Sequence, residues 1–234
     1  MPQWTFIQYF FAPQNKNENS SVLGGAIYNY AYGTRGKESA ILFTNDVEFV
    51  GNIATGASAN GGAIYNTADQ KIASITFDGK TNFSDNASIG ASSAFGGAIY
   101  NYAQNTNANA TITFGENSIL SFSNNTANGE LNDIYNRNGS IYILGTVESD
   151  IHLISKGGTI ALKAKDTDGD GKVIYGGSYD LTDTLLDLSG DGGKELTIED
   201  LTLNNTALKW DAEIKENDAG YNIISDILTP TGEF

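Results

Sequence analysis

The chain has 234 residues, of which 40% are hydrophobic, including 12 tyrosines and 11 phenylalanines. This composition is sufficient to bury a core and is not typical of a disordered protein. The absence of cysteine excludes disulfides and thiolate metal sites, and a net charge of −15 disfavours nucleic acids and anionic lipid surfaces, which require clustered cations.

Residues 1–22 precede the repeated part of the chain and are rich in aromatic side chains. We expect them to form an N-terminal cap or a first coil, because the open end of a repeat structure must be covered. Residues 15–21 are expected to form a polar loop. The apolar segment 4–12 is too short to insert in a membrane and has no signal-peptide flank or cleavage site. The chain is therefore expected to be a mature piece or a fragment of a longer exported protein.

An internal repeat occupies residues 22–136. The hexapeptide Gly-Gly-Ala-Ile-Tyr-Asn recurs at intervals of 37, 35 and 35 residues, the last time in a degenerate form. Its copies are residues 24–29, 61–66, 96–101 and 131–136. A period between 20 and 50 residues indicates a solenoid, a propeller or a similar array.

Each repeat unit contains three strand-like segments. The hexapeptide is followed by a variable polar loop, an apolar run that ends in phenylalanine, and a Phe-x-x-Asn segment, after which a polar loop leads back to Gly-Gly. The variable loops are residues 30–38, 67–73 and 102–110, and the Phe-x-x-Asn segments are residues 49–52, 83–86 and 122–125. This pattern predicts an all-β parallel β-helix, a single-stranded β-solenoid with three short strands per coil.

Stacked coils place identical residues above one another at about 4.8 Å, so that they form ladders. The predicted structural ladders are Ile27, Ile64, Ile99 and Ile134; Phe49, Phe83 and Phe122; and Asn52, Asn86 and Asn125. A further asparagine ladder is expected at a turn that ends the hexapeptide strand, because asparagine tolerates left-handed backbone angles. Its members are Asn29, Asn66 and Asn101.

Neighbouring residues of a strand face opposite sides, so isoleucine and tyrosine of the hexapeptide cannot both face the core. We predict that isoleucine faces inward and tyrosine outward. The outward tyrosines are Tyr28, Tyr65, Tyr100 and Tyr135. Such an aromatic stripe can bind sugars or a protein, or it can pack beneath the variable loops.

Strand-like segments continue over residues 137–234 without the repeat motif. Many of them alternate between apolar and polar residues, and Gly-Gly and Asp-Gly pairs separate them. No linker rich in proline or serine divides the two halves. We therefore predict further β-helix coils within one continuous domain.

The carboxylates of Asp166, Asp168 and Asp170 alternate along the chain and precede Gly171. This pattern predicts a calcium site, because it is that of the first half of an oxygen-ligand calcium loop. Gly177 stands where a bidentate acid is expected, so an acidic turn between two strands is the alternative. His152, the single histidine, lies in a strand-like run without a nucleophile motif and is expected to face solvent.

The alternation of Gly-Gly-Ala-Ile with Phe-x-x-Asn resembles the polymorphic outer membrane protein repeat of autotransporter passengers, best known from chlamydiae. The resemblance covers about half of the chain, residues 22–136. It implies a right-handed parallel β-helix that is secreted or displayed on the bacterial outer-membrane surface as an adhesin. It also implies a parent chain that carries an outer-membrane β-barrel. The lack of cysteine departs from the chlamydial proteins and implies a relative from another bacterium.

Three functions are compatible with these observations. The first is a non-catalytic passenger segment that adheres to host or matrix glycans or proteins through loops and outward ladders. The second is a β-helical carbohydrate-active enzyme, a polysaccharide lyase or hydrolase, although no catalytic residues can be assigned and both arginines, Arg35 and Arg137, are expected in loops. The third is a passive stalk. We favour the first, with no cofactor except calcium and no nucleic-acid partner.

Overall fold

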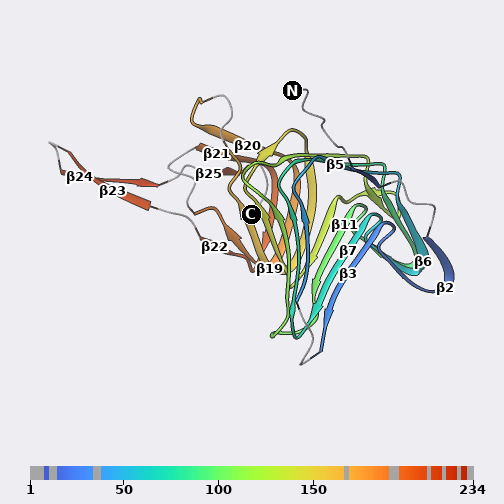
Figure 1. Ribbon diagram of the computed structural model, residues 1–234. Helices are drawn as coiled ribbons and strands as arrows, with labels where there is room; N and C mark the ends of the chain where they lie inside the picture. The colour runs from blue at the N-terminus through green and yellow to red at the C-terminus, as the bar shows by residue number, and fades with distance from the viewer. Residues whose placement is uncertain are drawn as a thin grey trace, which may run out of the picture.

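The computed structural model describes residues 8–10, 15–33, 38–165, 169–189, 195–209, 212–217, 220–225 and 228–230. Within these residues all regular structure is β-strand, and none of them forms a helix long and apolar enough to cross a membrane. Nearly all neighbouring strands are parallel and belong to successive coils of the chain (Figure 1). The prediction of an all-β parallel β-helix is confirmed.

A complete coil of the repeat region has four strands. The first full coil consists of β5 (Val47–Val50), β6 (Ile53–Asn60), β7 (Ile64–Asp69) and β8 (Ile72–Phe77). The next coil consists of β9 (Lys80–Ser84), β10 (Ala87–Phe95), β11 (Ile99–Ala103) and β12 (Asn109–Phe114). The structure thus has one strand per coil more than the sequence predicts, because β6 and β10 replace the expected polar loop before Gly-Gly.

Equivalent strands of successive coils form three parallel sheets. The first contains β1 (Gln8–Phe10), β5, β9, β13 (Ile119–Ser123) and β18 (Thr146–Val147). The second contains β2 (Asn15–Leu23), β6, β10 and β14 (Thr126–Ala127), and β15 (Glu130–Leu131) joins it antiparallel. Residues 15–21, expected as a loop, therefore belong to β2, whose register on β6 is interrupted between Asn17 and Ser21.

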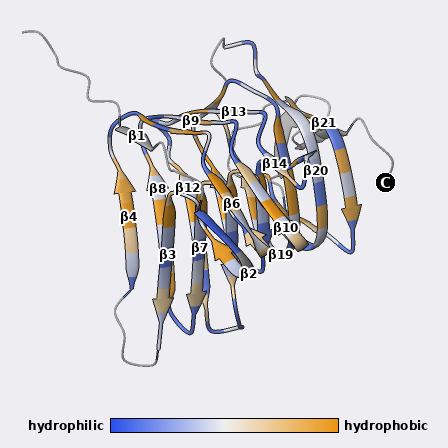
Figure 2. Ribbon diagram, turned by 90° about the vertical axis from the view of Figure 1, so that its right-hand side faces the viewer, coloured by the Kyte–Doolittle hydropathy of each residue, from blue (hydrophilic) through white to orange (hydrophobic). Residues whose placement is uncertain are grey.

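The third sheet has two arms that merge. One arm is β3 (Ile27–Tyr32), β7, β11 and β16 (Ile134–Arg137), and the other is β4 (Ser39–Phe43), β8, β12 and β17 (Ser140–Ile143). Figure 2 shows these strands lined up side by side along the stack. The long strand β19 (Ile151–Leu162) pairs with β16 through its first half and with β17 through its second half, and so it joins the arms.

The stack continues through β20 (Lys172–Asp187), β21 (Glu195–Asn204), β22 (Ala207–Lys209) and β25 (Leu228–Pro230), which pair in parallel. The structure differs from the predicted continuation at β23 (Ala212–Asn217) and β24 (Gly220–Ser225). These two strands pair antiparallel with each other and extend away from the stack (Figure 1).

The Gly-Gly turn before β7 fixes how closely the coils approach. Gly61 has a left-handed backbone with φ 67°, which glycine adopts without strain. A Cβ atom on Gly62 would lie 2.0 Å from the carbonyl oxygen of Gly97 in the next coil. Both glycines are therefore required, one for its conformation and the other for the close approach of two backbones.

Apolar ladders fill the space between the sheets. Ile64, Ile99 and Ile134 are in register and fully buried, whereas Ile27 in the edge strand β3 is partly buried. Phe49, Phe83 and Phe122 stack with centroid separations of 4.8 and 5.1 Å. A second stack, absent from the predicted ladders, consists of Phe43, Phe77 and Phe114. The rings of the two stacks meet at 85–89°, the edge-to-face geometry that aromatic pairs favour.

Two asparagine ladders hold the coils together by side-chain hydrogen bonds. Asn52 donates its amide to Asn86, and Asn86 to Asn125, at 2.8 Å each. We call this the Asn52 ladder. The second ladder is formed by the asparagines of the hexapeptide, whose amides donate to one another in the same way at 2.7, 2.8 and 2.9 Å. Its members are Asn29, Asn66, Asn101 and Asn136.

The position of the hexapeptide ladder corrects the prediction of a turn. Asn29, Asn66 and Asn101 lie inside β3, β7 and β11, face the opposite arm and are buried. The amide of Asn66 also donates to the carbonyl of Ala73 at 3.2 Å, and that of Asn101 to Ala110 at 3.0 Å. The ladder thus bonds the two arms to each other as well as one coil to the next.

Candidate binding surface

The tyrosines of the hexapeptide form a ladder on the outer face of the first arm. Tyr28, Tyr65, Tyr100 and Tyr135 are in register, and successive ring centroids lie 5.5, 5.1 and 5.5 Å apart. They belong to the opposite face from the isoleucines, which lie in the main core. The structure therefore has isoleucine inward and tyrosine outward.

The exposure of this ladder decreases sharply from its first ring inward. Tyr28 is 51% exposed, whereas Tyr65 and Tyr100 are 6% and 4% exposed. Phe95, at the end of β10, packs against Tyr100 and Tyr135 with centroid distances of 6.1 and 4.6 Å. Burial raises the pKa of Tyr65, and it raises the pKa of Tyr100 to about 12. The middle rings are therefore neutral and covered, and the ladder is open at Tyr28.

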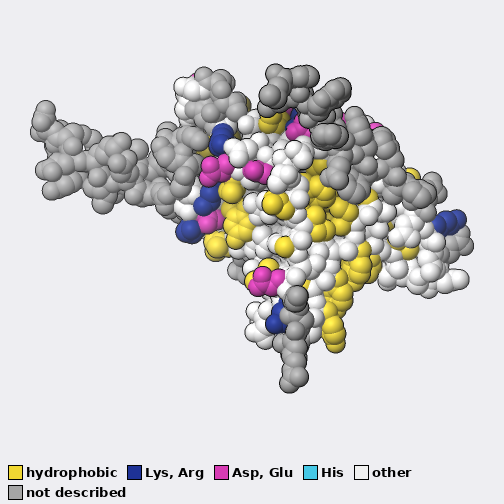
Figure 3. Space-filling view, viewed as in Figure 1, with side chains coloured by type: hydrophobic (Ala, Val, Ile, Leu, Met, Phe, Trp, Pro, Cys, Tyr) yellow, Lys and Arg dark blue, Asp and Glu magenta, His cyan; other side chains and the backbone are white. Residues whose placement is uncertain are grey.

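The outer face of β3 is the most exposed aromatic surface among the described residues. Alternation puts Tyr28, Tyr30 and Tyr32 on one side of this strand, with exposed fractions of 51%, 37% and 65%. Their rings pack against one another at 5.9 and 5.7 Å. Figure 3 shows hydrophobic atoms in a continuous band over this strand. We call these three side chains the β3 tyrosine patch.

We call the side of β3, β7, β11 and β16 that carries the tyrosine ladder the tyrosine face. A cation lies at its far end, on β16. Arg137, expected in a loop, is the last residue of β16 and is exposed. Its guanidinium carbon lies 5.0 Å from the ring centroid of Tyr102, a cation–π distance. A side-chain hydrogen bond with Tyr100 raises the pKa of Arg137. In the next coil Lys156 is in register with Arg137 and contacts Asp180 at 3.2 Å.

The variable loops are shorter than the sequence predicts. The first residues of each predicted loop belong to the strand before it, which is β3, β7 or β11. Only residues 70–71 separate β7 from β8. Much of the sequence that was expected to be exposed loop is therefore strand, and some of it is buried, as Thr67 and Ala68 are.

Asp133 is a buried carboxylate that the sequence analysis missed. It replaces the alanine of Gly-Gly-Ala-Ile in the degenerate fourth copy and is buried. Its Oδ1 accepts a hydrogen bond from the amide of Asn125 at 2.8 Å, and its Oδ2 accepts one from the backbone N–H of His152 at 2.7 Å. In the preceding coils the amide of each ladder asparagine donates to the equivalent asparagine of the next coil. The amide of Asn125 donates to Asp133 instead, so Asp133 terminates the Asn52 ladder.

His152 is half-buried instead of fully solvent-facing, and its Nδ1 lies 3.2 Å from Oδ2 of Asp133. A cavity of about 320 Å³ opens beside the pair, lined also by Ser149 and Asp150. Burial raises the pKa of the Asp133 carboxyl, and this effect outweighs the hydrogen bonds from His152 and Asn125. Both side chains are occupied in closing the ladder, which favours a structural role.

The raised pKa gives a testable dependence on pH. Ionisation of Asp133 costs the folded state more than the unfolded state, so its contribution to stability is full below about pH 4 and is lost as the pH rises through the folded-state pKa. Asp133→Asn keeps an oxygen for Asn125 and cannot ionise. We expect the stability of this variant relative to wild type to increase from about pH 4 to pH 7, measured by urea unfolding.

Asp85 offers a matched control, because Asp85→Asn makes the same chemical change outside the ladder. Asp85 is exposed and has a left-handed backbone conformation. A stability difference for Asp133→Asn that does not vary with pH would contradict the inferred burial cost.

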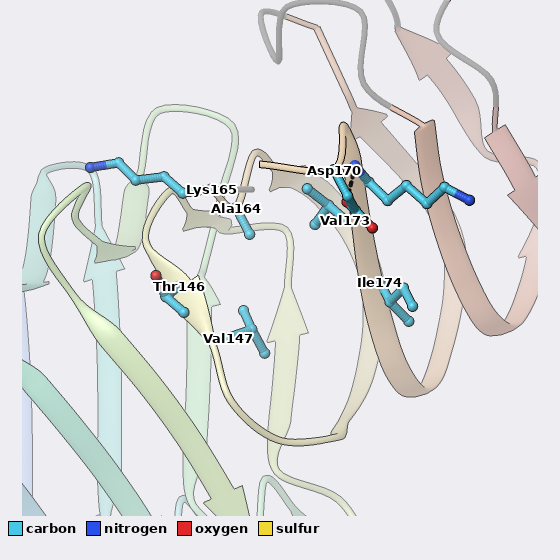
Figure 4. A pocket seen from close by; sticks show the side chains of 8 residues that line it. Thr146, Val147, Ala164, Lys165, Asp170, Val173 and Ile174 are labelled. Carbon is cyan, nitrogen blue, oxygen red and sulfur yellow. Dashed lines mark hydrogen bonds between the residues drawn. The ribbon is translucent and has the colours of Figure 1, made fainter. Parts of the chain in front are cut away.

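The predicted calcium ligands are only partly described. Asp166 and Asp168 lie outside the described residues. Asp170 accepts a hydrogen bond from the backbone N–H of Lys172 at 2.8 Å and lines a cavity of about 210 Å³. Figure 4 shows Asp170 and Val173 on the β20 side of this cavity. Among the described residues no group of three or more histidines and carboxylates is placed to hold a metal ion.

Comparison with known proteins gives one family match, which lies within the repeat region. Residues 46–67 match the family model of the Chlamydia polymorphic membrane protein repeat. The match contains one Phe-x-x-Asn segment, the unpredicted strand β6 and one Gly-Gly-Ala-Ile sequence. No curated protein and no solved structure matches the chain. The match supports the resemblance of this region to polymorphic membrane proteins and broadly fits a surface autotransporter-like passenger.

Proposed function

We propose that the chain is a non-catalytic passenger segment at the bacterial cell surface, and that it adheres to host or matrix saccharides through its tyrosine face. The observation that carries this proposal is the β3 tyrosine patch, three contiguous exposed tyrosines on one strand. Tyrosine is enriched at binding interfaces, because its ring supplies a large apolar surface and its hydroxyl a hydrogen bond.

The fold holds this patch rigidly. Asn29 and Ala31 lie between the three tyrosines in sequence and are buried on the inner face of β3. The amide of Asn29 is bonded to Asn66 in the next coil. The tyrosine rings also pack on one another, so little side-chain freedom remains to be lost when a ligand binds. A pyranose ring stacked on such a surface keeps its equatorial hydroxyls free to meet the phenol oxygens.

The test is binding of the purified chain to an array of glycans and extracellular-matrix proteins. We expect wild type to bind a subset of saccharides, and the triple variant Tyr28→Ser, Tyr30→Ser, Tyr32→Ser to bind at least about tenfold more weakly. A matched control is the double variant Leu42→Ser, Ile174→Ser, which removes two exposed apolar side chains elsewhere, each more than 60% exposed.

Equal losses in the two variants would show that exposed apolar area alone governs binding. Binding only to matrix proteins would replace the saccharide proposal by a protein partner. Absence of binding by wild type across the array would favour the passive stalk.

A further inference from the structure

The far end of the tyrosine face combines aromatic rings with Arg137, which forms no ion pair with any carboxylate of the described residues. Three tyrosine side chains lie close enough to Arg137 to affect its pKa, namely Tyr100, Tyr102 and Tyr135. The neighbouring cation Lys156 is already engaged, since its Nζ contacts Asp180 at 3.2 Å and the hydroxyl of Thr182 at 2.9 Å. Among the ion pairs of the described residues, none involves Arg137.

Two tyrosines lie beside the guanidinium. It lies over the Tyr102 ring at 5.0 Å and interacts with the Tyr100 hydroxyl. Arginine has five N–H donors in the plane of its guanidinium group. Stacking on a ring uses none of these donors and the Tyr100 hydroxyl uses one, so the others are available to a ligand. An oxyanion with two available oxygens, such as a carboxylate or a sulfate, can bind two of these donors at once, which fixes its orientation beside the rings.

The charge of the whole chain restricts the kind of anion. With a net charge of −15, the protein repels polyanions such as nucleic acids and long sulfated polysaccharides. Screening at physiological salt limits this repulsion to about 8 Å, so a single negative group in direct contact with the guanidinium is attracted. The site therefore suits one acidic group on an otherwise neutral ligand.

We propose that Arg137, with Tyr102 and Tyr135, forms a subsite for a saccharide residue that carries one acidic group, a carboxylate or a sulfate. The acidic group pairs with the guanidinium, and the sugar ring lies against the parts of the Tyr102 and Tyr135 side chains that remain exposed. This inference rests on the proposed function, because it names the class of saccharide that the tyrosine face selects.

The experiment compares three soluble probes, namely lactose, sialyllactose and lactose sulfate, which share a neutral core and differ in the acidic group. We expect wild type to bind at least one acidic probe at least about tenfold more tightly than lactose, which corresponds to about 1.4 kcal/mol. The two acidic probes distinguish a carboxylate from a sulfate. Arg137→Gln is expected to remove this preference, so that its affinity for the acidic probes no longer exceeds its affinity for lactose.

Lys80→Gln is the matched control, because it removes the same charge from an exposed residue on another sheet. It should keep the preference for the acidic probe. Thermal unfolding of Arg137→Gln should coincide with that of wild type, since the side chain is exposed.

Equal affinity of wild type for acidic and neutral probes would overturn the subsite and leave saccharide adhesion standing. An unchanged preference in Arg137→Gln would do the same. Loss of the preference in Lys80→Gln would show that net charge is responsible, and it would also overturn the subsite. Failure of wild type to bind any saccharide, in these assays and on the array, would remove the proposed function and this inference with it.

Discussion

Replacing Ile64 by aspartate is expected to unfold the repeat coils. Ile64 is fully buried at the start of β7, where it is in register with Ile27 and Ile99. A carboxylate at this position would have apolar neighbours in the coils before and after it and no cation to pair with. We expect the free energy of unfolding to fall by about 4–5 kcal/mol or more, the range of the most disruptive single substitutions. Urea unfolding followed by circular dichroism measures this loss.

The control introduces the same charge on the outer surface. Leu42 faces outward from β4, is 63% exposed and belongs to the same sheet. Leu42→Asp should change stability by no more than about 0.5 kcal/mol, as is usual for surface positions. If Ile64→Asp is as stable as Leu42→Asp, the isoleucine ladder does not form the core, and the inward assignment of this strand is wrong.

The repeat made the architecture predictable from sequence, because identical residues at a fixed interval must stack. The strand after Phe-x-x-Asn was nevertheless missed. β6 and β10 consist mainly of alanine, serine and glycine, which have low strand preference and give little hydrophobic alternation. Their inner positions hold small buried residues such as Ala54, Ala59 and Ser88. Only pairing with neighbouring coils makes these segments strands, and a single sequence window does not contain that information.

The turn assigned to Asn29 was wrong for a different reason. Asparagine favours turns in general, and the prediction gave that preference more weight than the alternation of the strand. Ile27, Asn29 and Ala31 lie two residues apart and therefore face the same side. An inward Ile27 requires an inward Asn29, and a buried amide requires partners, which the neighbouring coil supplies. Strict use of the alternation would have placed this ladder inside the strand.

The candidate surface was predictable in direction but not in extent. The tyrosines were expected to face outward, and they do, but the cover that Phe95 provides over Tyr100 and Tyr135 depends on β10, which the sequence did not reveal. The ladder end at Asp133 had a visible signal, because an acid replaces the alanine of the motif at the point where Phe-x-x-Asn stops recurring. That signal requires knowledge of the asparagine ladder before it can be interpreted.

Asn86→Ala is expected to lower the free energy of unfolding by about 3–5 kcal/mol, because it interrupts the Asn52 ladder. Oδ1 of Asn86 accepts from the backbone N–H and the side-chain amide of Asn52 at 3.0 and 2.8 Å. Its amide donates to the carbonyl of Phe49 at 2.9 Å and to Asn125 at 2.8 Å. Truncation removes these bonds at a fully buried site, where each deprived polar group costs about 1–3 kcal/mol.

Asn82→Ala is the matched control, because Asn82 lies in the adjacent strand β9 and faces outward, where its oxygen accepts one bond from Ser121 at 3.1 Å. Chemical unfolding of the two variants separates the ladder from asparagine content as such. A loss for Asn86→Ala much larger than for Asn82→Ala means that amide bonds between coils, together with the phenylalanine stacks, hold the solenoid together. Equal small losses would mean that water satisfies the opened groups, and that apolar stacking alone gives the repeat region its stability.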